Sequence, residues 1–258
     1  MDPRRTPVPL DYDDPVFRHG IPDDAAVRGS VFLPEYRDVH PQVADRLMTA
    51  GRSPVLDLGC GRGALGRLLD ARSVPWVGLD RSPAQLRHGY GPRLLADGAC
   101  VPFADATFGA VASLYTLYHF ADPLAPMREA ARVLRPGGIF VTCAPSRDNS
   151  PELARYLPSE PLSTFDSELA GEILSQVFDE VIVEPWQMPA FRLVDRESVL
   201  FHLLARQRSL DDAARAAEFA QRVEVAQEGH VRVGRVVRVA LRAVLLPVAL
   251  VACWRWRL

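Results

Sequence analysis

A run of glycines behind a short apolar stretch is the part of this sequence best suited to chemistry. Residues 54–66 read Pro-Val-Leu-Asp-Leu-Gly-Cys-Gly-Arg-Gly-Ala-Leu-Gly. The glycines allow the backbone to come directly against a ligand, because any side chain would fill that space. Asp57 precedes the first glycine, where a turn that binds a pyrophosphate through backbone N–H groups has no use for a carboxylate. The pattern predicts a ligand that carries an ammonium group and no phosphate.

Three further features follow the glycine turn in order along the chain. Asp80 ends the next apolar run, Asp97 precedes a Val-Pro-Phe loop, and Arg-Pro-Gly-Gly begins at residue 135. Each alone is a weak indication, because single acids are more often loop residues or helix caps. Together with Asp57 and its glycines, they resemble the class I S-adenosylmethionine-dependent methyltransferases, in the branch that includes the ubiquinone and menaquinone biosynthesis methyltransferases. The resemblance covers residues 41–145.

The resemblance assigns parts of S-adenosylmethionine to particular side chains, with S-adenosylhomocysteine as the product. Asp57 would hold the ammonium end, Asp80 would accept both ribose hydroxyls, and Asp97 would accept the adenine amino group. The other candidates for cofactor contact are the turn residues, the neighbours of the later acids, a serine at a strand end and a tyrosine of the N-terminal arm: Gly59, Cys60, Gly61, Arg81, Gly98, Ser113 and Tyr36. Considered alone, Cys60 is a small filler of the turn.

Candidate catalytic residues lie where the expected strand at 110–115 opens into the loop Tyr-Thr-Leu-Tyr-His-Phe, residues 115–120. A sulfonium methyl is already activated, so the enzyme mainly aligns two partners and in some cases removes a proton. His119 is the candidate base because imidazole titrates near neutrality, and Tyr118 is a candidate for orienting the substrate. The alternative is a structural histidine and a reaction without a base. The acceptor would be an O, N or C nucleophile of a small metabolite, with bacterial secondary metabolism as one setting.

The composition of the chain excludes several other classes of function. The chain has 258 residues, 48% of them hydrophobic, and a net charge of −2, so a full core is available and no global basic field disposes it to bind nucleic acid. Its four cysteines form no C-x-x-C pair, so no metal site is predicted. The apolar run 243–253 is too short for a transmembrane segment. With no signal peptide evident, we expect a cytoplasmic protein.

Strand and helix patterns alternate through the middle of the chain. Such alternation implies parallel strands joined by right-handed crossovers, an α/β fold. The resemblance implies a Rossmann-like, seven-stranded and mostly parallel sheet with one reversed strand and helices on both faces. The expected strands are 55–58, 76–79, 110–115, 139–143 and 181–183, and the expected helices are 41–49, 64–71, 83–89, 123–134 and 168–177.

We expect three parts: an N-terminal arm or cap at 1–40, the cofactor-binding core at 41–185, and C-terminal additions at 186–258. Helical patterns at 197–205 and 211–223 and the segment 145–165 would cover the cofactor face, with lining candidates Phe17, Phe32, Tyr36, Trp186, Met188 and Phe191. The tail from residue 230 carries six arginines and no acid. Its alternating valines favour a closing antiparallel strand. Its arginine spacing fits instead a basic amphipathic helix for a membrane surface or acidic partner. Homo-oligomerisation stays open.

Three rival functions remain. An NAD-dependent oxidoreductase would use Gly61, Gly63 and Gly66 as G-x-G-x-x-G, but the first glycine then falls two residues too late after the strand. A non-catalytic module would keep the fold and engage a partner through the tail. A base methyltransferase acting on ribosomal or transfer RNA is disfavoured by the acidic balance and by the lack of a zinc-binding segment.

Overall fold

The computed structural model describes residues 39–147 and 162–183 with their side chains, and the backbone of strands at 5–6, 30–32, 184–193, 230–239 and 252–254. The predicted helices at 197–205 and 211–223 lie outside the described residues, as do Phe17 and Tyr36. So do the side chains of Phe32, Trp186, Met188 and Phe191.

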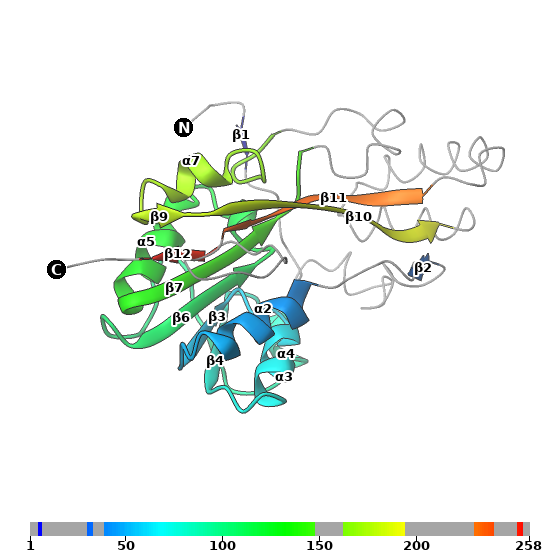
Figure 1. Ribbon diagram of the computed structural model, residues 1–258. Coiled ribbons are helices and arrows are strands. Elements are labelled where there is room, and N and C mark those ends of the chain that lie inside the picture. The colour runs from blue at the N-terminus through cyan, green and yellow to red at the C-terminus, as the bar shows by residue number, and fades with distance from the viewer. Residues whose placement is uncertain are drawn as a thin grey trace.

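Five parallel strands form the centre of the molecule (Figure 1). Their order across the sheet is β5 (Arg93–Leu95), β4 (Trp76–Asp80), β3 (Val55–Leu58), β6 (Phe108–Leu114) and β7 (Leu134–Ala144). The chain works outward from β3 to β5 and then crosses back to β6. The middle strands β3 and β6 are buried along their whole length, as expected for a sheet covered on both faces. The predicted parallel α/β sheet is confirmed.

Further strands join this sheet in antiparallel fashion. β10 (Val183–Leu193) pairs with β2 (Ser30–Phe32) and β11 (His230–Val239), and β11 pairs with β7. β12 (Ala252–Trp254) pairs with β7 and with β9 (Glu180–Val181). A separate pair joins β1 (Arg5–Thr6) to β8 (Leu162–Ser163). Residues 230–239 of the tail form the strand β11. The seven-strand count and the terminal additions stay predictions.

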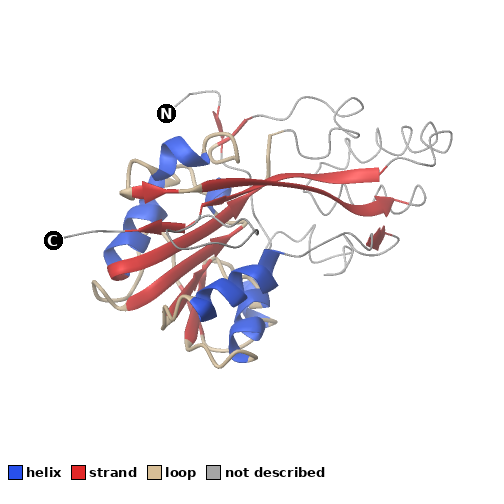
Figure 2. Cartoon of the chain, in the orientation of Figure 1, coloured by secondary structure: helices blue, strands red, loops and turns tan. Residues whose placement is uncertain are grey.

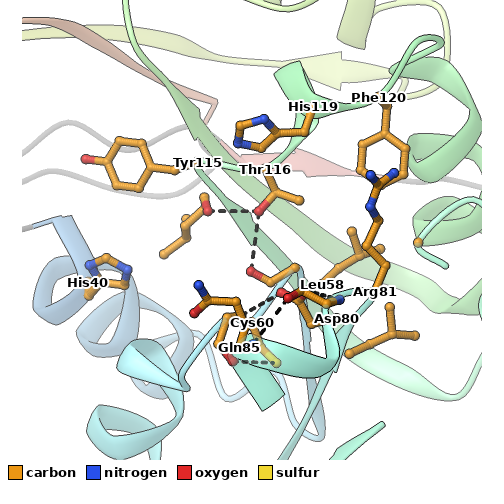
Figure 3. A pocket seen from close by; sticks show the side chains of 16 residues that line it. His40, Leu58, Cys60, Asp80, Arg81, Gln85, Tyr115, Thr116, His119 and Phe120 are labelled. Atoms are coloured by element: carbon orange, nitrogen blue, oxygen red, sulfur yellow. Dashed lines mark hydrogen bonds between the residues drawn. The ribbon is translucent and has the colours of Figure 1, made fainter. Parts of the chain in front are cut away.

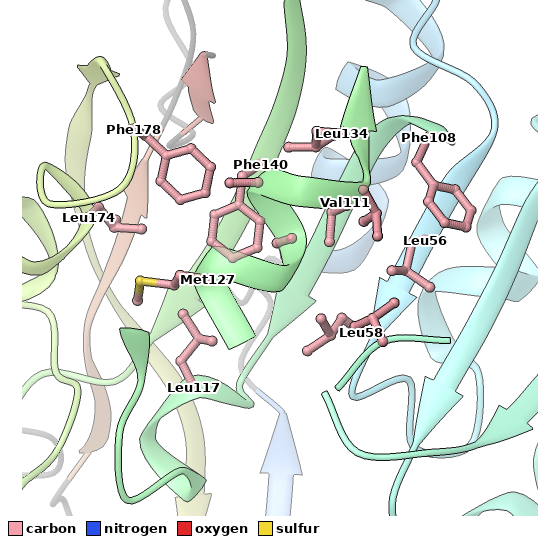
Figure 4. Close-up of a cluster of buried hydrophobic side chains, with 14 of the residues drawn as sticks. Leu56, Leu58, Phe108, Val111, Leu117, Met127, Leu134, Phe140, Leu174 and Phe178 are labelled. Atoms are coloured by element: carbon pink, nitrogen blue, oxygen red, sulfur yellow. The ribbon is translucent and has the colours of Figure 1, made fainter. Parts of the chain in front are cut away.

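Helices cover both faces of the sheet (Figure 2). On one face, α2 (Val39–Thr49) and α3 (Ala64–Asp70) share a buried apolar cluster with strands β3, β6 and β7. On the other face, α5 (Leu124–Val133) and α7 (Ala170–Leu174) contribute Met127 and Leu174 to a second cluster, which Figure 4 shows around Phe140. The short α4 (Pro83–Arg87) and the 3-10 turn η1 (Leu117–His119) follow β4 and β6. None of the helices in this described part of the chain is long and apolar enough to cross a bilayer.

Several boundaries differ from the sequence-based expectation. Strand β5 was not anticipated, because its three residues are exposed and carry no alternation. Its pairing with β4 at the sheet edge, rather than its own pattern, makes it a strand. The expected helix at 168–177 is shorter, at Ala170–Leu174, and the expected strand at 181–183 is divided between β9 and β10.

One arginine ties the loop between β5 and β6 to helix α5. The Arg132 guanidinium donates to the carbonyls of Val101 and Phe103 at 2.8 and 2.7 Å. It also pairs with Glu129 and Asp105, both at 2.8 Å. The hydrogen bond from Arg132 holds the pKa of Glu129 below its usual range. The loop that follows Gly98 is thereby fixed to the helical layer.

Candidate functional site

A cavity of about 240 Å³ opens at the carboxyl ends of β3, β4 and β6 (Figure 3). This is where open α/β sheets bind ligands, because the strand order reverses there and the flanking loops diverge. Of the side chains and glycines predicted for the site, those that line the cavity are Gly59, Cys60, Gly61, Asp80, Arg81, Gly98 and His119.

The glycine turn is held by the neighbouring strands on both sides. The backbone N–H groups of Gly59 and Cys60 donate to the carbonyl of Leu79, at 2.7 and 3.0 Å. Gly59 has a φ of +77°, and a Cβ added there would lie 2.3 Å from the methyl carbon of Thr116. A Cβ added at Gly61 would meet no atom closer than 3.8 Å. Gly59 is therefore required by the fold, whereas Gly61 leaves open space on the ligand side.

Asp80 is the carboxylate most clearly presented to the cavity. Its Oδ2 accepts from the Gly61 N–H at 2.8 Å and its Oδ1 from the Ser82 N–H at 2.9 Å. Ser82 in turn caps α4 by accepting from the Gln85 N–H at 3.2 Å. Each carboxylate oxygen has a second lone pair, so Asp80 can still accept two hydroxyl groups from a ligand. The backbone fixes the orientation that a vicinal diol needs.

Asp57 lies behind the turn and is not part of the cavity wall. Its side chain is 3% exposed. Burial raises the pKa of Asp57 to about 7; the nearby charge of His40 works against this shift and that of Asp80 adds to it. Asp57 is thus close enough to two cavity residues, His40 and Asp80, for their charges to influence its protonation near neutral pH.

The structure brings two other predicted contacts only near the site. The Asp97 side chain is exposed, does not line the cavity and accepts from the Ala99 N–H at 2.8 Å, as a turn residue does. Gly98 beside it does line the cavity. Ser113 is fully buried behind the wall, and its Oγ has no hydrogen-bond partner in the described structure. Tyr36 lies outside the described residues.

The loop after β6 presents His119 to the cavity and holds Tyr118 back from it. The two rings lie 4.2 Å apart between centroids, and Tyr118 packs against the apolar cluster of α5 and α7. The hydroxyl of the buried Thr164 donates to the Phe120 carbonyl at 2.7 Å and so fastens this loop. Tyr118 is thus absent from the cavity wall, and its predicted role in orienting a substrate stays a prediction.

Sequence reasoning missed several residues of the cavity wall, above all His40, Gln85, Tyr115 and Thr116. His40 belongs to α2, upstream of every motif, so no spacing signal marks it. Tyr115 has a φ of +57°, which turns its side chain away from the strand direction. Cys60 lines the cavity, but burial and the nearby Asp57 raise the pKa of its thiol. It stays protonated and acts as a filler.

Comparison with known proteins identifies the central region. Residues 56–142 match the profile of the family described as Methyltransferase domain. This region is therefore similar to methyltransferase domains. The demethylmenaquinone methyltransferase of Corynebacterium kroppenstedtii is 39% identical over 92 residues, or 34% of this chain and 40% of that protein. The O-methyltransferase cnsE of Penicillium expansum is 31% identical over 132 residues, or 45% of this chain and 48% of that protein.

Solved structures share the fold of the methyltransferase domain. A protein from Anabaena variabilis, described as a methyltransferase of an antibiotic biosynthesis pathway, superimposes with a TM-score of 0.57 at 13% identity, over 78% of this chain and 96% of that one. The YcgJ protein of Bacillus subtilis gives a TM-score of 0.52 at 15% identity, with the same coverage. The chain spans less than half the length of the curated relatives named above.

The residues of the cavity fit S-adenosylmethionine, the cofactor that the resemblance implies. Asp80 offers two aligned acceptors, and the glycine turn leaves room for a ligand beside them. Leu58, Leu79 and Phe120 contribute apolar surface to the wall. A nucleoside with a free diol and no phosphate matches this set, whereas a dinucleotide would bring phosphates toward the carboxylates.

Proposed function

We propose that the protein is an S-adenosylmethionine-dependent methyltransferase that methylates an O, N or C nucleophile of a small metabolite. The observation that carries the proposal is the Asp80 carboxylate, which the Gly61 and Ser82 N–H groups aim into a cavity at the strand reversal. The methyltransferase match of residues 56–142 supports it. A small acceptor is supported by the absence of a net basic charge and by the named relatives.

In this mechanism the cofactor supplies a methyl group already activated on a sulfonium. Asp80 binds the ribose diol, and Gly61 and Gly98 let the backbone approach the nucleoside. Asp57 provides negative charge for the ammonium end. Leu58 and Phe120 exclude water from the nucleoside part of the cavity. The protein thus contributes mainly alignment.

His119 is our candidate for the base that takes a proton from the acceptor. It faces the cavity from η1, on a loop fastened by Thr164. We assign Tyr118 to holding the imidazole, because its ring packs on His119 and lies off the cavity wall. A His119→Ala variant with unchanged turnover would remove His119 from this role.

Calorimetry with S-adenosylhomocysteine tests the proposal, with Asp80→Asn as the informative variant. We expect low-micromolar binding to the wild-type protein and a loss of more than about tenfold in the variant, because the amide cannot accept both ribose hydroxyls. Asp122→Asn is the matched control, since Asp122 accepts from the Leu124 N–H at the start of α5 and does not line the cavity. Binding of NAD in place of S-adenosylhomocysteine, or full affinity in Asp80→Asn, would overturn the proposal.

A radiolabelled methyl screen against small phenols, amines and total RNA then separates the acceptor classes. We expect transfer to a small molecule. Transfer to RNA alone would favour the base methyltransferase. A protein that binds S-adenosylhomocysteine and methylates none of these acceptors would favour the non-catalytic module.

A further inference from the structure

The backbone on either side of His119 is held by a hydroxyl group from a distant part of the chain. The Thr164 hydroxyl donates to the Phe120 carbonyl at 2.7 Å and also lies 3.4 Å from the Tyr118 carbonyl. Thr164 is 2% exposed, so bulk water is kept from taking its place as donor. The N–H groups of His119 and Phe120 bond within their own 3-10 turn. Thr164 therefore supplies a restraint from outside the turn.

The turn carries two residues of the cavity wall, His119 and Phe120 (Figure 3). The Phe120 ring reaches across to the backbone of Gly98, because a Cβ added at Gly98 would lie 3.0 Å from its Cζ. Both side chains belong to one short stretch of backbone. A displacement of the carbonyls that Thr164 contacts would therefore move the imidazole and the phenyl ring together.

Thr164 is itself held in a fixed segment, residues 164–169, which connects β8 to α7. Phe165 is fully buried in the apolar cluster of α5 and α7. The Asp166 side chain is 2% exposed, pairs with Arg147 at 3.2 Å and accepts from the Glu168 N–H at 3.1 Å. Since Arg147 follows β7 directly, these contacts attach the segment to the carboxyl end of the sheet. The donor is thus fixed independently of the turn that it restrains.

We propose that Thr164 is a positioning residue, which fixes the turn after β6 and thereby sets where the His119 imidazole and the Phe120 ring stand in the cavity. The use of these two side chains rests on the proposed function, whereas their placement by Thr164 requires no ligand. Thr164 lies outside residues 56–142, which match the methyltransferase profile. The inference therefore assigns part of the shaping of the site to a segment beyond that match.

Two comparisons between variants isolate the hydroxyl group. Thr164→Val keeps the shape of the side chain and removes the donor, whereas Thr164→Ser keeps the donor. Thr164→Ala, compared with Thr164→Ser, removes the same group if the valine variant does not fold. Thr107→Val is the matched control, because the Thr107 hydroxyl also donates to a backbone carbonyl at 2.7 Å but does not line the cavity. Thermal unfolding shows whether each variant is folded.

The first measurement uses the protein without ligand. In ¹H–¹³C NMR spectra of the imidazole groups, the His119 signal is assigned by its loss in His119→Asn. This signal should shift in Thr164→Val and keep its wild-type position in Thr164→Ser and Thr107→Val. A threonine that served stability alone would lower the unfolding temperature and leave the signal in place. An unchanged His119 signal in the variants without the hydroxyl would overturn the inference.

Calorimetry with S-adenosylhomocysteine measures the consequence for binding. Thr164→Val should weaken binding by about three- to tenfold, the effect of one neutral hydrogen bond, because Phe120 is then no longer held against Gly98. Thr164→Ser and Thr107→Val should stay within about twofold of the wild type. Equal losses in Thr164→Val and Thr164→Ser would also overturn the inference, since the donor would then make no difference. If the wild-type protein does not bind S-adenosylhomocysteine, the proposed function fails, while the NMR comparison still decides whether Thr164 positions His119.

Discussion

Burial gives Asp57 an acid–base behaviour unlike that of an aspartate in water. The strand β3 places its carboxyl inside the sheet, where the described residues supply no hydrogen bond to it. Desolvation then disfavours the charged form. Such a group costs stability in the free protein whenever it is ionised, and a ligand with an ammonium group offsets that cost.

Replacing Asp57 by asparagine should therefore stabilise the free protein at alkaline pH. The folded protein keeps a proton on Asp57 between the ordinary pKa of 3.8 and about 7, where the unfolded chain has released it. The contribution of Asp57 to the free energy of unfolding thus falls as the pH rises through this window. The free energy of unfolding of Asp57→Asn, relative to that of the wild type, should rise by up to about 4 kcal/mol between pH 4 and pH 8. Urea unfolding at both pH values measures this, and a constant difference would contradict it.

Gly59 should tolerate no side chain, whereas another left-handed glycine should tolerate one at moderate cost. Gly59→Ala combines an unfavourable φ with a collision against Thr116. Gly51 has a φ of +61° and no atom within 4 Å of an added Cβ, so Gly51→Ala isolates the backbone term. We expect about 1 kcal/mol of destabilisation for Gly51→Ala and at least about 2 kcal/mol more for Gly59→Ala. Equal unfolding midpoints in urea would show that Thr116 moves aside.

At this scale, the sequence identifies residues whose type is dictated by backbone geometry and misses those brought in by packing. Gly59 and Gly61 belong to one turn, and Asp80 ends the next strand along the chain, so their spacing in the sequence carries the signal. Asp97 has the expected spacing, but its carboxylate satisfies its own turn instead of facing the cavity. His40 reaches the site only because α2 packs on the sheet, which no local pattern encodes.

The segment between β5 and β6 has little structure of its own and depends on helix α5. Arg132 supplies the attachment, because a guanidinium can donate to two carbonyls and two carboxylates at once. The loop leads from Gly98 at the cavity into β6. Its fixation therefore bears on the shape of the cavity near Gly98.

Arg132→Lys should loosen this loop even though the charge is kept. A single ammonium cannot reach all of these acceptors, so we expect a loss of about 1–2 kcal/mol in the free energy of unfolding and faster proteolysis within 101–107. Arg128→Ala is the control, because the Arg128 side chain is 64% exposed and its ion pair with Asp122 is long, at 3.8 Å. It should change stability by less than about 0.5 kcal/mol. A lysine variant as stable as the wild type would show that the loop is held by other contacts.

Among the elements, those with a strong period or a stop signal are predicted well. β3 matches its expected bounds, and α5 ends before Arg-Pro-Gly-Gly as expected. Strand β5 is different, because its state is set by a neighbour across the sheet. The pairing of β11 with β7 is also beyond local patterns, since it joins segments far apart in the chain.

The whole molecule is organised around β3. One of its partners, β4, is the next strand along the chain, and the other, β6, comes about 50 residues after β3. Asp57 lies opposite Gly78 of β4 and Ala112 of β6. The two apolar clusters on either side both include residues of β3 and β6. The buried cores on both faces of the sheet therefore depend on contacts between β3 and β6, which are far apart in the sequence.

Protein synthesis runs from the N-terminus, so this arrangement determines the order in which the parts of the site can form. When only about the first 100 residues have left the ribosome, β3 and β4 can already pair. At that stage Thr116 is not yet packed against the glycine turn, and the part of the cavity wall that follows β6 is missing. A nascent chain of that length exposes an unpaired edge of β3. The site is completed only when the loop after β6 emerges, so a chain truncated before residue 108 should be dependent on chaperones and unable to bind a nucleoside.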